Sequence, residues 1–502
     1  MDDFHIPSDL HGVNIHFVGI KGTGMAALTE ILCSRGAVIT GSDVEDVFYT
    51  DKVLLRCGIK ALPFSENNIS KKLACVIYSS AYNFETNCEL SKAKKLDIPC
   101  ILYSQALGQL SKLSYSVGVA GVHGKTTTTG LVGTLLEGLN LPAQVLAGSL
   151  ISSFGTQDEG SCTLSLGNKY FVAETCEYQR HFMSFSPKKI ILTSVESDHQ
   201  DYYPTYKDIR DAFVDYASLL PQNGQLIYCA DDLGATEVSE IVKSKRDDIE
   251  LVPYGITATG PWHISMGEVK NGRQSFCVDA FPKQEFYLSV PGQHLVLNAT
   301  AAMALVCSLY SQENNLKMDN LFFNDIFTKL SNSLISFKGA KRRSEIIGRT
   351  NNVIFMDDYA HHPTAIKTTL AGFRSFYPNR KIIVDFMSHT YTRTAALLEE
   401  FANSFTSCDK VILHKIYGSA RENASLTGVT GKDLYNKAKN LYPEVCYYEE
   451  VFEAEKDLIQ ELSVKDERFS EGYLFVTMGA GDNWKLGKKV YEILSSLEYT
   501  KK

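Results

Sequence analysis

The chain has 502 residues and a formal net charge of −8. This length predicts about three domains of roughly 100 to 200 residues each. The acidic balance, without a long basic run, argues against a protein that binds nucleic acid or anionic membranes. The twelve cysteines stand singly without a CxxC pair, and neither the polar N-terminal sequence nor any later run indicates secretion or membrane insertion. We therefore expect a cytoplasmic protein with reduced thiols.

Apolar runs that alternate with helical stretches predict an α/β fold with three domains, at 1–112, 113–336 and 337–502. We expect the first and third to be Rossmann-like, and the central one to hold a mixed sheet because Asn271-Gly272 indicates a hairpin. The runs expected to form strands are 14–20, 37–43, 74–80 and 98–104 in the first domain, 117–122, 170–174 and 190–195 in the second, and 353–358, 381–386, 410–416 and 473–482 in the third.

A glycine turn follows the first expected strand and opens a helix. Gly22, Gly24 and Ala27 have the spacing of a dinucleotide-binding fingerprint, and Asp43 ends the next strand about twenty residues later. Such a turn admits a diphosphate close to the backbone, where the N-terminus of the helix stabilises its charge. Three interpretations remain at this point: an NAD site, a site for another diphosphate such as that of a UDP-sugar, or a tight turn without a ligand.

A second glycine turn, "GVAGVHGKTTTT" (118–129), resembles the phosphate-binding loop of nucleoside triphosphatases. It departs from the common pattern because Val119 stands where the first glycine is expected. The parts that contact phosphate are present: Gly121 and Gly124 let the backbone turn, Lys125 can reach the β and γ phosphates, and Thr126 can bind a metal ion. We therefore expect an ATP site here.

Polar residues follow the next two expected strands of the central domain. Glu174 ends one strand, and Asp198, His199 and Asp201 come just after the other. Because parallel strands carry their ligands at their carboxyl ends, we expect Thr126, Glu174 and His199 to form a metal site. A carboxylate beside an imidazole suits Mn²⁺, and Mg²⁺ accepts this set when phosphate oxygens complete it.

These features occur together with further motifs in one order along nearly the whole chain. The ordered set is "HFVGIKGTGM", "GSD", "YSSAY", "GVHGKTTTT", "AETCEYQRHF", "ESDHQDYYP", "HLVLNATAA", "KGAKRRSE", "DDYAHHPTAI", "SHTYTRTAALLEEFA" and "MGAGDNW". It resembles the Mur ligases of peptidoglycan synthesis, and among them the members that join L-alanine to UDP-N-acetylmuramate. The phosphate loop of that family also lacks the first glycine. The resemblance implies a UDP-sugar domain, an ATP domain and a third domain that completes the site.

The resemblance also implies roles for individual residues. The UDP-sugar contacts would be Gly22, Thr23, Gly24, Met25, Ser42, Asp43 and Ser80. ATP would be bound by Gly121, Val122, His123, Gly124, Lys125, Thr126, Thr127, Asn298, Arg342 and Asp358. The amino acid would be bound by Tyr359, His361, His389 and Arg393, and the catalytic group would comprise Lys125, Glu174, His199 and Arg343. ATP, Mg²⁺ (with Mn²⁺ as the alternative), UDP-N-acetylmuramate and L-alanine are the implied ligands, while the oligomeric state is left open.

The chain departs from the family pattern at two places. Thr390 stands where some members have an arginine, which places more weight on His389 and Arg393. Phe213-Val214 occupy the region where several later-acting Mur ligases carry a carbamylated lysine that bridges metal ions. This second departure is typical of the branch that adds alanine, and it leaves more of the metal binding to Glu174 and His199.

The expected chemistry is activation of a carboxylate by phosphorylation. The lactyl carboxylate would attack the γ-phosphate of ATP, and the amine of L-alanine would then displace phosphate from the acyl phosphate. His199 and His361 are the candidates for the base, and domain closure would keep water from the intermediate. We expect His362 only to begin a helix before Pro363, "GAGD" (479–482) only to turn the chain, and Cys176 and Glu177 only to pack.

Three other functions compete with this interpretation. A recycling ligase would join a preformed tripeptide to the same sugar, but its first glycine turn typically has Phe at the position of Gly24. An NAD-dependent dehydrogenase rests on Gly22, Gly24, Ala27 and Asp43 alone. A nucleotide-gated binding protein without catalysis is disfavoured by the intact Lys125, Thr126, Glu174 and His199.

Overall fold

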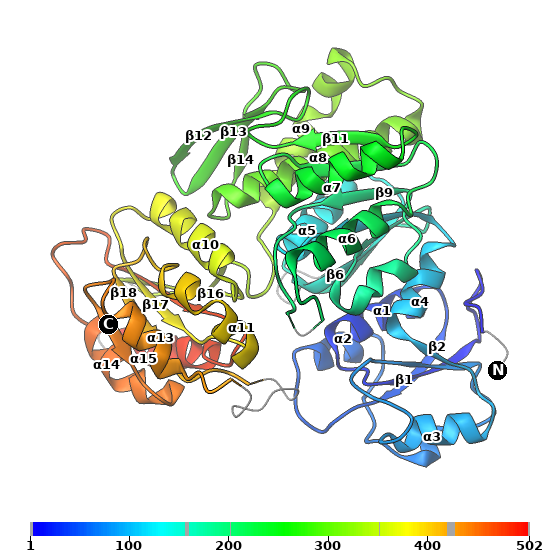
Figure 1. The fold of residues 1–502 in the computed structure, drawn as a ribbon, viewed down its shortest axis with the longest axis horizontal. Coiled ribbons are helices and arrows are strands. Elements are labelled where there is room, and N and C mark those ends of the chain that lie inside the picture. The colour runs from blue at the N-terminus through cyan, green and yellow to red at the C-terminus, as the bar shows by residue number, and fades with distance from the viewer. Residues whose placement is uncertain (1–3, 156–159, 201, 351, 419–426, 500–502) are drawn as a thin grey trace.

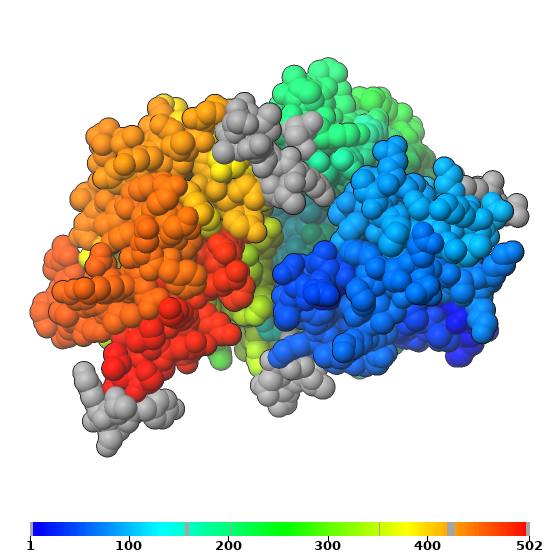
Figure 2. Space-filling view, turned by 90° about the horizontal axis from the view of Figure 1, so that it is seen from below, coloured from blue at the N-terminus to red at the C-terminus, as the bar shows by residue number. Residues whose placement is uncertain are grey.

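The computed structural model describes residues 4–155, 160–200, 202–350, 352–418 and 427–499, so Asp201 lies outside the described residues. Three parallel or mixed sheets follow one another along the chain, each with helices packed on it, and a small antiparallel sheet adjoins the second (Figure 1). The predicted three-domain α/β fold is therefore confirmed. The N-terminal and C-terminal domains lie on either side of a hollow, with the central domain behind them (Figure 2).

The N-terminal domain is built on a four-stranded parallel sheet. In spatial order its strands are β2 (Val38–Ser42), β1 (Asn14–Val18), β3 (Cys75–Tyr78) and β4 (Cys100–Leu102). Its helices are α1 (Thr23–Ser34), α2 (Thr50–Arg56), α3 (Cys88–Lys95) and α4 (Tyr103–Ser111). The apolar strands alternate with helices whose buried faces are rich in Leu, Ile and Ala, so each crossover covers the sheet and keeps it parallel.

The central domain has a seven-stranded mixed sheet. In spatial order its strands are β11 (Glu250–Tyr254), β10 (Gln225–Cys229), β9 (Lys189–Leu192), β5 (Tyr115–Ala120), β8 (Tyr170–Glu174), β6 (Ala143–Ile151) and β7 (Ser161–Ser165), and β7 alone is antiparallel to its neighbour. The helices beside it are α5 (Lys125–Gly138), α6 (Tyr206–Ala217), α7 (Leu233–Lys245), α8 (Gln293–Asn314) and α9 (Asn320–Ser336). Because β5, β8, β9 and β10 are parallel, their carboxyl ends meet at one edge.

A second, three-stranded antiparallel sheet in this domain consists of β12 (Ile264–Lys270), β13 (Arg273–Val278) and β14 (Phe286–Leu288). The predicted hairpin is present: β12 pairs with β13, and Asn271 and Gly272 between them both have positive φ. Among the described residues, helix α8 is long and apolar enough to span a membrane, although the sequence was not expected to contain such a segment. In the structure, 78% of its most apolar window is buried inside the protein. Packing in the core of the domain accounts for this composition.

The C-terminal domain contains a six-stranded sheet. In spatial order its strands are β15 (Glu345–Arg349), β16 (Val353–Asp358), β20 (Tyr473–Met478), β17 (Lys381–Phe386), β18 (Lys410–Leu413) and β19 (Val445–Tyr447), with β15 antiparallel and the rest parallel. Its helices are α10 (Pro363–Phe376), α11 (Tyr391–Ala396), α12 (Leu398–Ala402), α13 (Gly431–Ala438), α14 (Glu455–Leu462) and α15 (Trp484–Tyr499). Helix α10 packs against α8, which brings the first turn of α10 to the central domain (Figure 1).

Several expected strands end earlier than their apolar runs. The run 98–104 stops at Leu102 and continues as α4, and the run 190–195 leaves the sheet after Leu192. The runs 410–416 and 473–482 end as strands at Leu413 and Met478. In each case the chain has passed the carboxyl edge of its sheet, where the backbone turns away from the ladder. Of these segments, the residues directly after Leu192 form a loop at the edge that carries the site.

Candidate active site

A cavity of about 530 Å³ lies between the central and C-terminal domains. The central domain lines it with the β5–α5 turn, the segments that follow β8, β9 and β10, and the first turn of α8. The C-terminal domain lines it with Arg343, the segment after β16, α10 and the His389–Arg393 segment. Loops at the carboxyl ends of two separate parallel sheets therefore face one another across one cavity.

The β5–α5 turn has the backbone of a phosphate-binding loop. Gly121 has a φ of 134° and Gly124 a φ of 82°, which only glycine adopts readily. A Cβ at Gly124 would lie 2.8 Å from Oδ1 of Asn298 on α8. Helix α5 begins at Lys125, so its free N–H groups point into the cavity that Val122, His123 and Thr127 also line. Glycine is thus required both for the turn and for the close approach of α8.

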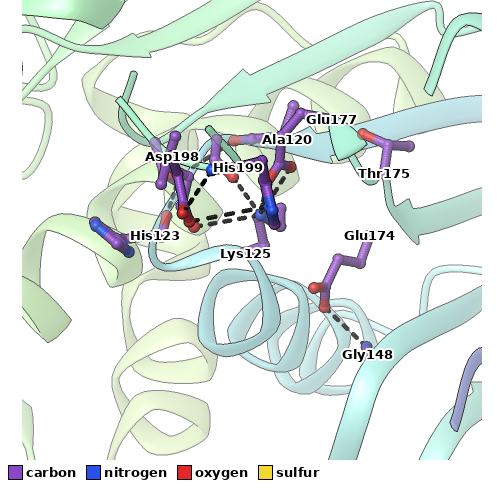
Figure 3. A network of polar contacts seen from close by, with 12 residues as sticks. Ala120, His123, Lys125, Gly148, Glu174, Thr175, Glu177, Asp198 and His199 are labelled. Carbon is purple, nitrogen blue, oxygen red and sulfur yellow. Dashed lines mark hydrogen bonds and ion pairs between the residues drawn. The ribbon is translucent and has the colours of Figure 1, made fainter. Parts of the chain in front are cut away.

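The ammonium group of Lys125 is held by a buried carboxylate. Lys125 Nζ donates to Glu177 Oε2 at 3.0 Å and to the carbonyl of Val122 at 3.3 Å. Burial alone would lower the pKa of Lys125, but the charge of Glu177 outweighs it and raises the pKa. Burial alone would raise the pKa of Glu177, whereas Lys125 and His199 bring it below its ordinary value. Both groups are therefore charged at neutral pH (Figure 3).

Thr126 and Glu174 form a pair of hard oxygen donors beside this lysine. Thr126 Oγ1 donates to Glu174 Oε2 at 2.8 Å, and the same oxygen accepts the N–H of Gly148 at 2.8 Å. A Cβ at Gly148 would lie 2.6 Å from Glu174 Oε2, so glycine keeps room for the carboxylate. A hydroxyl and a carboxylate at hydrogen-bond distance fit Mg²⁺, which prefers oxygen ligands and takes the remainder from phosphate and water.

His199 has different partners from Glu174. It follows β9 in the left-handed conformation with a φ of 54°, and its Nε2 lies 3.4 Å from Glu177 Oε1. Figure 3 shows His199 near Lys125 and Glu177, while Glu174 points to Gly148. The three expected metal ligands thus form one pair, Thr126 and Glu174, with His199 at a separate carboxylate.

A buried ion pair joins the central and C-terminal domains next to His199. Arg393 donates through Nε and Nη2 to Asp198 Oδ1, at 3.1 and 2.7 Å, and the two residues are only 7% and 4% exposed. Burial alone would raise the pKa of Asp198, but the adjacent Arg393 and His199 bring it well below its ordinary value. The expected amino-acid ligand Arg393 therefore also holds the two domains together.

The two neighbouring arginines near the start of the C-terminal domain point in different directions. Arg342 donates to Asp357 Oδ2 at 2.8 Å and to the carbonyl of Gly479 at 2.8 Å, within its own domain, and it does not line the cavity. Arg343 does line the cavity, and both guanidinium groups lie over the ring of Tyr359, 5.1 Å from its centroid. The guanidinium of Arg342 fixes the turn 479–482, so of the two arginines Arg343 is the one placed on the cavity.

The segment after β16 places three expected residues on the cavity. Asp358 accepts the N–H groups of Ser344 and Ala360 at 2.7 and 2.8 Å, which fixes its carboxylate at the end of the strand. His361 Nδ1 lies 2.9 Å from the carbonyl of Tyr359. Burial, reinforced by the charge of Arg393, holds the pKa of His361 well below its ordinary value, so its ring is neutral at pH 7. Tyr359, His361, His389 and Arg393 all line the cavity.

The first glycine turn lies in the N-terminal domain, away from this cavity. Gly22 caps α1, and a Cβ at Gly24 would lie 2.8 Å from the ring of Tyr103. Asp43 accepts the N–H of Lys21 at 2.7 Å, and it lines a separate pocket of about 380 Å³. Two expected ligands have buried side chains: Met25 is 3% exposed, and the hydroxyl of Ser42 donates to Glu89. Thr23 contacts Tyr49, and Ser80 is exposed after β3.

Sequence reasoning missed two acidic residues of the site. Glu177 was expected only to pack, but its carboxylate contacts both Lys125 and His199. The sequence predicts no role for Asp198, whereas the structure shows that its carboxylate pairs with Arg393. The sequence offered one signal, since both residues lie just past the carboxyl ends of parallel strands. Their partners lie 52 and 195 residues away along the chain, so no local pattern names them.

Three family models match this chain in succession. They are described as the Mur ligase family catalytic domain (residues 14–115), the Mur ligase middle domain (119–306) and the Mur ligase glutamate ligase domain (342–481). The UDP-N-acetylmuramate–L-alanine ligase of Treponema pallidum (strain Nichols) is 49% identical over 97% of this chain and 98% of its own length. The ligase of the same name from Borreliella burgdorferi is 37% identical over 94% of this chain and 97% of its own length.

A solved structure shares the whole architecture. The crystal structure of the UDP-N-acetylmuramate–alanine ligase MurC from Thermotoga maritima has a TM-score of 0.74 and 26% identity, and the match covers 96% of this chain and 99% of that one. The sequence relatives and this structure extend over all three domains and both glycine turns. We conclude that the chain belongs to the Mur ligase family.

Proposed function

We propose that this protein is the ATP-dependent ligase that joins L-alanine to the lactyl carboxylate of UDP-N-acetylmuramate and releases ADP and phosphate. The observation that carries this proposal is the pairing of a phosphate loop, with its half-buried Lys125, and a C-terminal segment with Arg343 and Arg393 across one cavity. A relative that bears that activity in its name is 49% identical over 97% of this chain, which supports the proposal. The reaction supplies a precursor of peptidoglycan, and its nucleotide substrates favour the cytoplasm.

The first step is phosphoryl transfer at the phosphate loop. The free N–H groups at the start of α5 bind the phosphates, and Lys125 moves from Glu177 to the oxygens of the γ-phosphate. Arg343 contributes a second positive charge from the opposite wall. Thr126 and Glu174 would hold Mg²⁺, which neutralises the charge that develops on the phosphate oxygens when it is bound. These charges stabilise the transition state, and closure of the domains would strengthen their effect by excluding water.

The second step is attack by the amine of L-alanine on the acyl phosphate. The amine attacks in its neutral form, and His361 lines the cavity where its imidazole could take the proton that the nitrogen loses as the amide forms. Arg393 is placed to bind the alanine carboxylate, with Tyr359 and His389 on the same wall. Because Arg393 also pairs with Asp198, alanine binding and domain closure use the same side chain.

The N-terminal domain binds the UDP part of the sugar nucleotide. The start of α1 at Gly22 to Met25 offers free N–H groups to the diphosphate, and Asp43 stands at the carboxyl end of β2. Neither the start of α1 nor Asp43 lines the cavity that holds ATP. The sugar nucleotide therefore has to extend from the N-terminal domain to that cavity. The same turn without the second domain would fit an NAD enzyme, but the phosphate loop and its lysine have no use in hydride transfer.

The deciding experiment supplies ATP, Mg²⁺ and UDP-N-acetylmuramate with one amino acid or peptide at a time and weighs the product by mass spectrometry. We expect L-alanine to give a product heavier by one alanyl residue, with one phosphate released per product. Glycine, L-serine and the tripeptide of the recycling reaction are the alternative substrates, each tested in a separate reaction. Turnover with the tripeptide alone would replace this proposal by the recycling ligase, and phosphate release without an amide product would point to an uncoupled ATPase.

A further inference from the structure

A second cluster of metal-type donors shares no residue with the Thr126–Glu174 pair, and two of its members, His123 and Glu196, line the same cavity. His123 belongs to the β5–α5 turn, Glu196 to the loop after β9, and His362 caps α10 in the C-terminal domain. One ligand atom from each lies within 4.8 Å of the others, and within the described part of the chain no other three His, Cys, Asp or Glu residues come so close. The expectation that His362 begins the helix is confirmed, but its ring also faces the central domain.

The separations suit a small divalent ion. His362 Nδ1 lies 3.5 Å from Glu196 Oε1, and His123 Nε2 contacts the same oxygen. The two imidazole rings have centroids 5.2 Å apart. Ligands about 2.0 to 2.1 Å from a tetrahedral zinc ion are about 3.3 Å from one another. The three side chains therefore need only small adjustments of their torsion angles to share one ion.

His362 gives the independent indication that a ligand belongs here. The residue is 5% exposed, and neither of its ring nitrogens has a hydrogen-bond partner among the described residues. A buried nitrogen without a partner destabilises the fold, because it has lost its hydrogen bonds to water and gained none in return. A bound ion would satisfy the nitrogen that faces Glu196 at no cost to the fold.

The other two ligands are already held in place by neighbouring polar groups. Thr364 Oγ1 donates to Glu196 Oε2 at 2.9 Å, which leaves Oε1 directed at the two histidines. Ser194 Oγ accepts the backbone N–H of His123 at 2.9 Å and so fixes the turn that carries its ring. Oriented ligands of this kind are a regular feature of metal sites in proteins.

We propose that His123, Glu196 and His362 bind a divalent transition-metal ion of the Zn²⁺ class at a site distinct from that of ATP-bound Mg²⁺. Two imidazoles and one carboxylate favour Zn²⁺, Co²⁺ or Ni²⁺, whereas Mg²⁺ prefers an all-oxygen set. The ion ties the phosphate loop and the loop after β9 to α10, and so links the central and C-terminal domains. Because release of products requires these domains to separate, the ion slows turnover by holding them closed.

The binding test needs no catalysis and is independent of the proposed function. The full chain, freed of metal and kept in excess Mg²⁺, is titrated with Co²⁺ and followed by visible absorption, and with Zn²⁺ by calorimetry. We expect one ion per chain and intense absorption bands of low-symmetry Co²⁺ with nitrogen ligands. His362→Asn is expected to weaken Zn²⁺ binding at least about 100-fold. Zn²⁺ binding equal to wild type in this variant, or absent from the wild type, would overturn the proposal.

Two further variants keep the test sharp. His11→Asn is the matched control, because His11 is an exposed histidine paired with Asp9 in the N-terminal domain, and it should bind Zn²⁺ as the wild type does. If His362→Asn fails to fold by circular dichroism, Glu196→Gln removes the charged ligand while keeping its shape. Full Zn²⁺ affinity in folded Glu196→Gln would count against the site.

The consequence for turnover is measured with saturating ATP and Mg²⁺. Zn²⁺ should inhibit the wild type and His11→Asn alike, a chelator should reverse the inhibition, and His362→Asn should need at least tenfold more Zn²⁺ for the same effect. Equal inhibition of all three proteins would mean that Zn²⁺ acts at Thr126 and Glu174, and the link to domain closure would be wrong.

Discussion

The molecule contains two strand–glycine–helix turns that look alike in sequence and differ in the charges around them. At Gly22 and Gly24 the neighbouring lysine, Lys21, donates to the carbonyl of Asp46, and its charge is used within its own loop. At Gly121 and Gly124 the lysine, Lys125, points into the cavity among acidic residues, and a second domain faces it. The backbone of both turns can bind a diphosphate. Only the second has a lysine ammonium group on the cavity and arginines on the opposite wall, which phosphoryl transfer requires.

This difference teaches that a glycine turn specifies binding, whereas its surroundings specify chemistry. Free N–H groups at the start of a helix only bind the diphosphate in the N-terminal domain. In the central domain, equivalent groups form part of the reaction centre. The comparison gives predictions for substitutions, which follow from the largest expected effect to the smallest, and one for the pH dependence of the link between the domains.

Removing the cation of the second turn should have the largest effect. Lys125→Ala deletes the charge that stabilises the transferred phosphate, and we expect kcat to fall roughly 10³-fold. Amide formation is followed by mass spectrometry and phosphate release in parallel. The control is Lys169→Ala, since the side chain of Lys169 is 56% exposed and pairs with Glu313 at the surface. If Lys125→Ala kept more than a tenth of the activity, the two turns would not differ as described.

Breaking the link between the domains should have the next largest effect. Asp198→Asn leaves the buried Arg393 without its carboxylate, which costs about 3–5 kcal/mol in the closed arrangement. We expect kcat/KM for L-alanine to fall at least about 100-fold, with each tenfold step worth about 1.4 kcal/mol. Small-angle scattering with ATP and sugar nucleotide bound should show a more open molecule than the wild type.

The pH dependence of this link follows from the lowered pKa of Asp198. A carboxyl group whose pKa falls on folding contributes stability that is fully present above its unfolded pKa and is lost as the pH drops through the folded one. The link should therefore hold throughout pH 6 to 9, and loss of closure within that range in the wild type would contradict the assignment.

The two adjacent arginines should separate catalysis from stability. Arg343→Ala removes a charge from the cavity wall, and we expect kcat to fall roughly 10- to 100-fold with an unchanged midpoint of thermal unfolding. Arg342→Ala loses its bonds to Asp357 and Gly479, and we expect the free energy of unfolding to fall by about 1–3 kcal/mol. Denaturant titration and steady-state kinetics measure both. The reverse pattern would show that Arg342 is the phosphate ligand.

The first turn should give the smallest effect, confined to substrate binding. In Gly24→Ala the new methyl group would meet the ring of Tyr103 at 2.8 Å, so the start of α1 must shift. We expect KM for UDP-N-acetylmuramate to rise about tenfold and kcat at saturation to stay the same. Tyr103→Leu in the same chain makes room for the methyl group and should restore part of the affinity. A fall in kcat with unchanged KM would place this turn in the reaction centre.

Much of this protein could be predicted from sequence because it depends on local pattern. Apolar runs such as 353–358 and 381–386 became β16 and β17 with the expected bounds, and Asn271-Gly272 turns the chain between β12 and β13. The phosphate loop could also be predicted, because the lysine and the threonine that act on phosphate and metal follow Gly124 directly, within one turn of helix. Residues just past strand ends, such as Glu174 and Asp358, followed from the rule for parallel sheets.

The sequence by itself thus determined the three sheets, the two glycine turns and the residues available at their edges, since periodicity and turn chemistry act over a few residues. Only the tertiary structure decided which of those residues meet. The side chain of Arg342 bonds within its own domain, whereas that of Arg343 lines the cavity. Asp198 pairs with Arg393, and His362 lies beside Glu196, in each case across the boundary between two domains. Such pairings depend on how the domains pack and on which charged groups become buried. A local sequence pattern predicts neither of these.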